Sequence, residues 1–258
     1  MALFTDGSIS EVQDILAYEA NLVVVADAEG IDLESKLRLA QSEVGAELGV
    51  AALGPGNLYW TGQTAAQFQR FHLEQVVVTS PLKLWHTFQT LSIAYRDAYN
   101  RKLNDKYLPK WTEYKDLAQW AANLLYQSGV GVVLGPVPRP ARPVLDAVTG
   151  TLEALALYVR VSWVGTSGVE GVPSIEVAFE TEANQALRVT PPVGPAVAAG
   201  WNVFVGTASG EETKQNASPL VPGQPWIMPG TGLVIGVAAG NGQEPDLYKT
   251  IPRFLQRG

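Results

Sequence analysis

The sequence contains no cysteine, only two histidines and only two methionines. Without cysteine the chain can form no disulfide bond, no thiolate nucleophile and no cysteine-ligated zinc site. The histidines, His72 and His86, are fourteen residues apart, which matches no metal-ligand spacing, so we interpret both as structural residues. Stability is therefore expected to come from packing or from assembly with other subunits.

Charged side chains are also scarce, at 17% of the chain, and the formal net charge is -7. A dedicated nucleic-acid binder neutralises phosphates with clustered Lys and Arg and is usually basic, so the charge argues against that class. No apolar run approaches the ~20 residues that span a bilayer. The first six residues lack the basic and apolar regions of a signal peptide. We expect a soluble protein that is not exported through the general route.

Catalytic and nucleotide-binding motifs are missing as well. The glycine pairs at residues 129–131 and 230–232 lack the other parts of a dinucleotide fingerprint, and no phosphate loop or nucleophile elbow occurs. The acidic run at residues 27–32 fails as a calcium loop because its twelfth position is Arg38. The carboxylate pair Glu211-Glu212 lies in a predicted turn. We predict that the chain is not an enzyme and uses no cofactor or metal.

What the sequence does contain is a helical first half. A Ser-x-x-Glu capping box at residues 8–11 predicts a helix over residues 9–19, and Asp32 can cap a second helix that ends before Gly54. Ser80 and Pro81 precede a long apolar stripe at helical spacing, and Thr112 can open a further helix that ends near Gly129 in a left-handed cap. Residues 1–135 are therefore predicted to be a helical domain.

The second half of the sequence has a different composition and a different hydrophobic pattern. Residues 136–143 hold four prolines and predict an extended, semi-rigid linker. Short β-rich runs then alternate with Gly, Pro and Ser turns, which predicts an immunoglobulin or fibronectin III-like β-sandwich over residues 144–242. Residues 243–258 form a terminal arm. The predicted fold class is thus a multidomain α+β protein.

Two features of this chain suggest partners. The arm carries Tyr248, Ile251, Phe254 and Leu255, whose apolar side chains need either a partner surface or a place on their own domain. Charge is uneven, because residues 1–35 hold eight acidic and no basic side chains, whereas residues 83–115 hold seven basic and three acidic ones. These runs are interpreted either as solvated helix faces or as a subunit interface or channel wall.

Three stretches of the β half resemble fibronectin type III-like domains of tailed-bacteriophage structural proteins: residues 158–164 (YVRVSWV), 168–174 (GVEGVPS) and 200–210 (GWNVFVGTASG). The resemblance covers about residues 143–240, with Val169 inserted and Phe204 replacing a tyrosine. In the helical half, residues 94–107 (AYRDAYNRKLNDKY) and 111–115 (WTEYK) are similar to helical modules of phage head-to-tail adaptors, the connector or neck proteins of the virion.

This resemblance implies a dodecameric homo-oligomeric ring in the neck of a virion, assembled in the host cytoplasm, which joins the portal protein to a tail or nozzle protein and lets DNA pass without specific binding. An acidic protein around DNA would not trap the duplex. The implied portal-docking residues are Tyr248, Ile251, Pro252, Phe254 and Leu255. The implied channel or inter-subunit helix carries Lys83, Arg96, Arg101, Lys102 and Lys106.

An alternative remains open at this point. The chain could be a tail or decoration protein whose β-sandwich binds host-surface glycans, with Trp163, Trp201 or Trp226 stacking on sugars.

Overall fold

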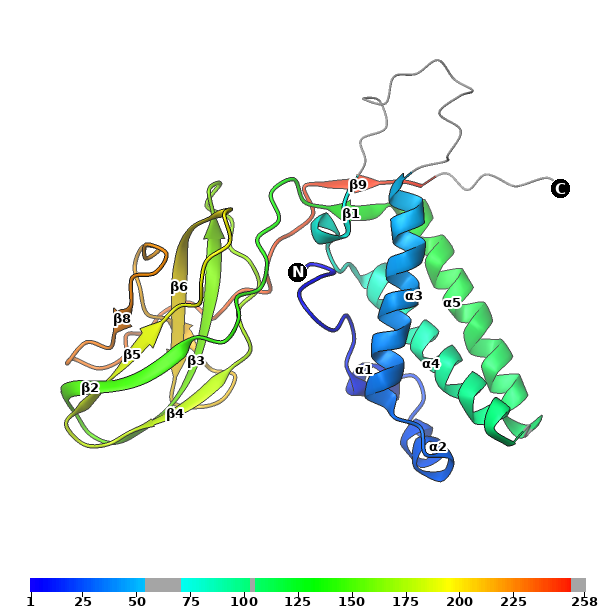
Figure 1. The fold of residues 1–258 in the computed structure, drawn as a ribbon, viewed down its shortest axis with the longest axis horizontal. Coiled ribbons are helices and arrows are strands. Elements are labelled where there is room, and N and C mark those ends of the chain that lie inside the picture. Colours follow the sequence, from blue (N-terminus) through cyan, green and yellow to red (C-terminus); the bar gives the residue numbers. More distant parts are fainter. Residues whose placement is uncertain (54–70, 103–104, 252–258) are drawn as a thin grey trace, which may run out of the picture. The chain divides into compact units, whose positions relative to one another are not determined.

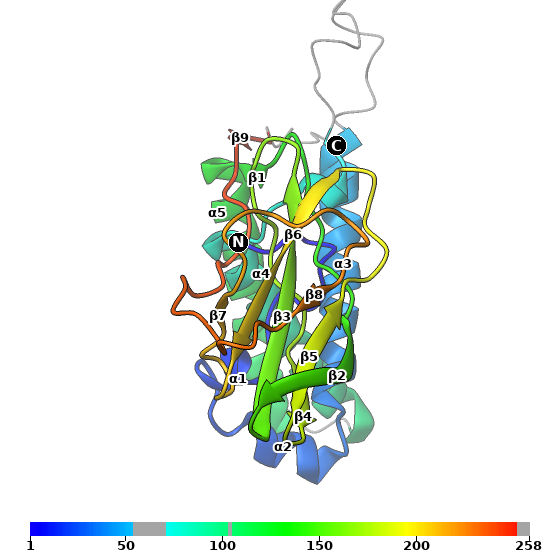
Figure 2. The same cartoon turned by 90° about the vertical axis from the view of Figure 1, so that its left-hand side faces the viewer.

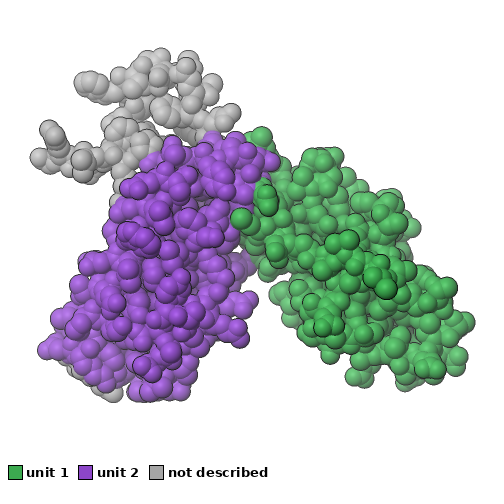
Figure 3. Space-filling view, turned by 180° about the vertical axis from the view of Figure 1, so that it is seen from behind, with its two compact units in different colours: residues 1–6, 134–244 green, residues 7–133, 245–258 purple. Residues whose placement is uncertain are grey.

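A computed structural model describes residues 1–53, 71–102 and 105–251 of the chain. The structure contains two compact units, drawn in different colours in Figure 3. The β unit consists of Met1–Asp6 and Leu134–Glu244, and the helical unit of Gly7–Val133 and Pro245–Gly258. The chain therefore passes between the units three times. Its helical region followed by antiparallel sheets confirms the predicted α+β class.

The helical unit contains α1 (Val12–Leu16), α2 (Leu22–Glu29), α3 (Leu33–Leu53), α4 (Ser80–Lys102) and α5 (Leu108–Ser128), together with the short 3-10 helices Leu73–Gln75 and Asp105–Tyr107 (Figure 1). The central helix is α4, which packs against α5, α3, α2 and α1. Its core-facing side chains include Leu82, Trp85, Phe88, Leu91 and Tyr95, all buried. No helix in the described part of the chain is both long enough and apolar enough to cross a membrane.

Two predicted helix starts are wrong. At the first, α1 begins at Val12, and the reciprocal capping box joins Glu11 to Asp14, with the Glu11 amide donating to Asp14 Oδ2 at 2.8 Å. The segment before it is fixed by tertiary contacts, because Ile9 and Ser10 are both buried. The helix expected over residues 9–19 is therefore shorter. Its start depends on the burial of Ile9 and Ser10, which the local sequence does not indicate.

At the second, α5 begins at Leu108 rather than at Thr112, whose hydroxyl donates to the Leu108 carbonyl at 3.0 Å from inside the helix. Pro109 lies in the first turn, where a proline is favoured because its fixed φ suits a helix start. Gly129 does end α5, but with φ 98° and ψ 143°, outside the expected left-handed region. The predicted cap at Asp32 is confirmed, since Asp32 Oδ1 accepts from the Glu34 amide at 3.1 Å.

The β unit consists of two antiparallel sheets. One has the order β2 (Val144–Leu152), β5 (Gln185–Thr190), β8 (Trp226–Ile227). The other has the order β4 (Val177–Thr181), β3 (Leu155–Gly165), β6 (Ala198–Gly206), β7 (Thr213–Lys214). Alternate β3 side chains enter a common core with residues of the first sheet: Leu157, Val159, Val161 and Trp163 pack with Leu187, Val189 and Trp226.

The stretch of residues 136–143, expected to be a linker, is part of the β unit. Val137 is buried in the β core, and its amide donates to Gln243 Oε1 at 2.6 Å. The Arg139 amide donates to Asp6 Oδ1 at 2.7 Å. Side chains from both ends of the sequence therefore hold this proline-rich stretch in place, which composition alone does not indicate.

The helical unit also contains a pair of strands that the sequence does not predict. The strand β9 (Leu247–Lys249) pairs antiparallel with β1 (Val130–Val132), so that Tyr248 lies opposite Gly131. The first part of the arm thus folds back onto the helical unit.

Candidate interaction surfaces

The arm places Tyr248 on the surface of the helical unit. Tyr248 lies in the middle of β9 and is 58% exposed, whereas Ile251 is half-buried and donates its amide to the Tyr126 carbonyl at 3.4 Å. The structure therefore brings Tyr248 and Ile251 to the C-terminal end of α5. Pro252, Phe254 and Leu255 lie outside the described residues.

Gly129 permits the close approach of the arm. A Cβ atom at Gly129 would lie 3.0 Å from Tyr248 Cβ and 3.3 Å from the Lys249 backbone, at a φ of +98° that side chains rarely adopt. The Gly129→Ala substitution should loosen the β1–β9 pairing by about 1–3 kcal/mol. Amide hydrogen exchange at residues 247–249 should then be faster than in the wild type.

The matched control is Gly49→Ala in α3, where an added Cβ meets nothing within 4 Å. Because alanine is the better helix former, this variant should be more stable by about 0.5–1 kcal/mol. Unchanged exchange at residues 247–249 in Gly129→Ala would show that the arm does not depend on this contact.

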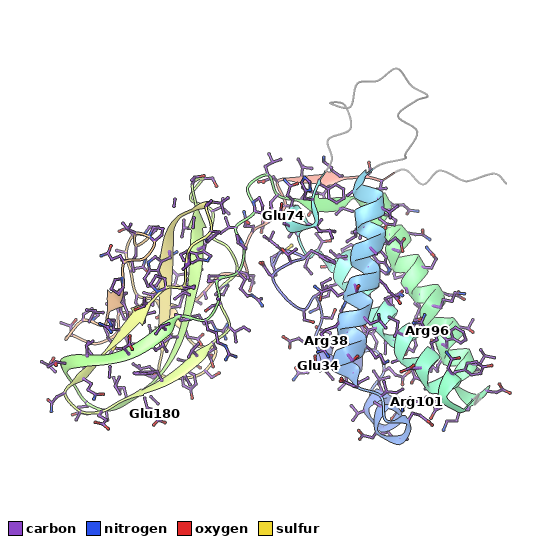
Figure 4. All side chains as sticks on the ribbon, in the orientation of Figure 1. Glu34, Arg38, Glu74, Arg96, Arg101 and Glu180 are labelled. Atoms are coloured by element: carbon purple, nitrogen blue, oxygen red, sulfur yellow. The ribbon has the colours of Figure 1, made fainter. Side chains whose placement is uncertain are left out.

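The basic residues expected on the long helix are engaged within the helical unit. Lys83 Nζ lies 2.8 Å from Asp14 Oδ1, and Arg96 lies 3.6 Å from a Glu43 carboxylate oxygen. Figure 4 labels Arg96 and Arg101 on α4. These pairs leave no continuous row of unmatched cations along the described part of α4.

The basic residues in the last turn of α4 and just after it also contact groups of the helical unit. Arg101 donates to the Glu29 carbonyl at the end of α2. Lys106 Nζ lies 4.5 Å from the centre of the Tyr107 ring. Lys102 is the last residue of α4, and its side chain lies outside the described residues.

The acidic N-terminal and basic central segments therefore meet each other. Lys83 Nζ contacts Asp14 at 2.8 Å, and Lys110 Nζ contacts Glu19 at 3.0 Å. The sequence suggested solvated faces or an intermolecular surface, whereas the structure shows pairing inside one unit. Ion pairs that solvent still reaches contribute about 0–1 kcal/mol each, so these partly exposed pairs orient helices more than they stabilise them.

A buried aromatic and acidic cluster joins α5 to the chain after α1. Tyr114 donates its hydroxyl to Glu19 Oε2 at 2.8 Å and stacks on Tyr95 at 5.6 Å between ring centres. Burial alone would raise the pKa of Glu19, but the hydrogen bonds from Tyr114 and Lys110 outweigh it and lower that pKa. The Glu19 carboxylate is thus a fixed anion that anchors α5 to the segment between α1 and α2.

A second cluster, in the β unit, contains two coupled carboxyl groups. Arg160 on β3 lies 3.3 Å from Glu176 Oε2 and 3.4 Å from Glu212 Oε1. Ser209 Oγ donates to Glu176 at 2.8 Å and the Gly210 amide donates to it at 3.0 Å. The cluster fastens the turn between β6 and β7 to β3.

The pKa values of the two carboxyl groups move apart. The hydrogen bond with Glu212 is the main cause that lowers the pKa of Glu176 to about 2. Burial, together with the same hydrogen bond, raises the pKa of Glu212. Of the two carboxyl groups, Glu212 is therefore the one that keeps its proton to the higher pH. Nothing in the sequence distinguishes Glu212, which is buried, from its neighbour Glu211, which is exposed.

The stability that the Glu212 proton supplies is complete below the ordinary glutamate pKa of about 4.3. It is lost as the pH rises through the higher pKa of the folded state. The Glu212→Gln variant keeps a neutral hydrogen-bond donor and cannot ionise. Its melting temperature should therefore rise relative to wild type as the pH goes from 4 to 8.

The matched control for this prediction is Glu211→Gln, next to the cluster. Its melting temperature should follow that of the wild type at every pH. A Glu212→Gln variant that loses stability relative to wild type toward pH 8 would contradict the raised pKa of Glu212.

One described pocket lies in the helical unit, between α1, α4 and α5. It has a volume of about 480 Å³ and is lined by Tyr18, Pro81, Leu84 and Leu124, with the Asp14–Lys83 ion pair beside them. No group of three His, Asp or Glu side chains that could hold a metal occurs among the described residues. The pocket is a mixed apolar and ionic surface with no nucleophile held against a base.

The three tryptophans considered for glycan stacking are buried. Trp201, Trp163 and Trp226 are 0%, 2% and 8% exposed, and all three belong to the β core. They cannot stack on a sugar in this fold, so the glycan alternative loses its contact residues. Comparison with protein-family models and with curated proteins finds no match for the chain.

Proposed function

We propose that the chain is a structural virion protein, a head-to-tail adaptor whose dodecameric ring joins the portal to a tail or nozzle protein. The observation that carries the proposal is the arm, which leaves the β unit, pairs with β1 of the helical unit and exposes Tyr248. A large aromatic side chain held outward on a short strand is suited to a partner surface.

The β unit is proposed to be an immunoglobulin or fibronectin III-like domain. Its two antiparallel sheets enclose a single core, and alternate residues of each long strand point inward. This arrangement supports a sandwich of that class. In an adaptor the unit would brace neighbouring subunits.

Passage of DNA is proposed to occur without specific binding. The net charge is -7, and the described basic side chains of α4 contact acidic or carbonyl groups of their own unit. Because non-specific DNA binding requires unpaired Lys and Arg near the phosphates, this pattern supports weak affinity. As proposed residues of a channel or inter-subunit helix, Lys83 and Arg96 are paired with carboxylates, Arg101 contacts a backbone carbonyl, and Lys106 lies over the Tyr107 ring.

The test is capture of the protein by its cognate portal assembly, measured for wild type and for Tyr248→Glu. Tyr248 points outward, so the charge should leave β9 paired while weakening portal binding at least tenfold, which corresponds to about 1.4 kcal/mol. Trp120→Glu is the matched control, because Trp120 is 52% exposed on α5 of the helical unit. Equal capture of all three proteins would reject the arm, and no capture of any would reject the adaptor.

A further inference from the structure

The C-terminal part of the β unit contains a long stretch without charge. Residues 215–243 include no Asp, Glu, Lys, Arg or His. Exposed apolar side chains are concentrated in this stretch: Val221 is 64%, Ile227 53%, Val234 50%, Ile235 104% and Val237 77% exposed. Exposed apolar surface with little charge is typical of the centre of a protein interface.

Residues 234–238, which we call the edge segment, lie along the outer strand of the four-stranded sheet. The Lys214 amide of β7 donates to the Val237 carbonyl at 2.8 Å, and Thr213 forms an antiparallel bridge with Ala238. The Val234 amide donates to Gln215 Oε1 at 2.9 Å. In Figure 2 the orange stretch after β8 passes beside β7. The edge segment is thus fixed by its backbone.

The side chains of the edge segment point outward. Ile235 and Val237 are two residues apart and therefore share one face of an extended chain. Fully exposed Ile and Val side chains gain about 25 cal/mol for each Å² that another surface covers. An ordered backbone reduces the entropy lost when that surface is covered.

The charge of the protein indicates what covers this face. Copies with a net charge of -7 repel each other, so two copies can approach most easily where neither carries charge. A nucleic acid would need Lys or Arg, and a charged partner would need the opposite charge, and the stretch has neither. An uncharged apolar face is complementary to another copy of itself or to a similar face.

We infer that copies of this chain associate through the edge segment of the β unit, with Ile235 and Val237 at the centre of the contact. A contact between the same segment of two copies is isologous and pairs two copies, so it adds to the contacts that would close the proposed ring and does not depend on that proposal. The partner surface is a second copy of the same chain.

The experiment compares wild type with Ile235→Lys/Val237→Lys by sedimentation velocity over a hundredfold range of concentration. The double variant should shift the self-association constant at least tenfold toward monomer, because it buries two unpaired charges in the contact. The matched control is Val24→Lys/Val50→Lys in the helical unit, where the two valines are 68% and 72% exposed. It should associate as the wild type does.

A second variant, Ile235→Ser/Val237→Ser, removes apolar area without adding charge and should give a smaller shift in the same direction. If the Lys variant unfolds, as near-ultraviolet circular dichroism would show, the Ser variant decides the result. Wild-type association that neither variant weakens would overturn the edge segment as the contact. Wild-type protein that stays monomeric, or that binds phosphatidylcholine vesicles instead of itself, would also overturn it.

These outcomes separate the inference from the proposed function. Portal capture that persists while the edge variants leave self-association unchanged would keep the adaptor and reject the contact. Self-association that the edge variants abolish, in a protein that no portal captures, would keep the contact and reject the adaptor.

Discussion

Lowering the pH from 7 to below 4 is expected to remove about 3 kcal/mol of stability from the helical unit through His86 alone. His86 is 0% exposed on the central helix α4, and its Nε2 lies 3.0 Å from the Leu37 carbonyl of α3. Among the described residues no hydrogen-bonding group reaches its Nδ1. The imidazole is therefore a neutral donor between two helices.

Burial lowers the pKa of His86 to about 4, although the Leu37 carbonyl and the charge of Asp14 act in the opposite direction. A histidine whose pKa is lower in the folded state stabilises the fold above its unfolded pKa of about 6.5. That contribution is lost as the pH falls from about 6.5 toward 4. Denaturant unfolding at a series of pH values, followed by helix circular dichroism, measures it.

His86→Gln keeps a donor for the Leu37 carbonyl and cannot be protonated, so its stability should depend much less on pH in this window. His72→Gln is the matched control, because His72 is exposed and its replacement should leave the pH dependence as in the wild type. A His86→Gln protein that loses stability with acid as steeply as the wild type would contradict the neutral core histidine.

Trp201→Ala is expected to destabilise the β unit by about 3–5 kcal/mol, the range for removing a buried aromatic side chain from a core. Trp201 is 0% exposed on β6, pairs with Trp163 of β3, and donates its Nε1 to the Val221 carbonyl at 3.2 Å. The variant would leave a cavity and remove one of the two hydrogen bonds to the Val221 carbonyl, which also accepts from the Gln224 amide at 3.0 Å. Guanidinium unfolding followed by β-sheet circular dichroism measures the loss.

The matched control is Trp120→Ala on α5, where the tryptophan is 52% exposed. Surface substitutions away from special contacts change stability by about 0.5 kcal/mol or less. Equal losses for the two variants would mean that Trp201 is not a core residue.

The sequence predicts the long elements better than the short ones. The helices α3, α4 and α5 are visible because apolar residues recur at helical spacing over many turns, as for Leu37, Val44 and Leu48. The start of α1 could not be predicted, because the burial of Ile9 and Ser10 depends on residues far along the chain. The capping box expected at residues 8–11 does not start the helix, and the box that does joins Glu11 to Asp14 three residues further on.

The proposed contact surfaces are predictable only in part. Tyr248 stands out as an apolar residue beyond the β domain, but its pairing opposite Gly131 joins residues more than a hundred positions apart. The ion pairs of Lys83 and Arg96 likewise depend on which helices become neighbours. The raised pKa of Glu212 depends on its burial, which the sequence of two adjacent glutamates does not reveal.

The measurement that tests the central proposal most directly is the native mass of the full-length protein alone and after mixing with its cognate portal assembly. The adaptor proposal predicts a single complex in which one copy of this chain binds each portal subunit, with Tyr248→Glu absent from that complex. A protein that stays monomeric and leaves the portal mass unchanged would contradict the proposal.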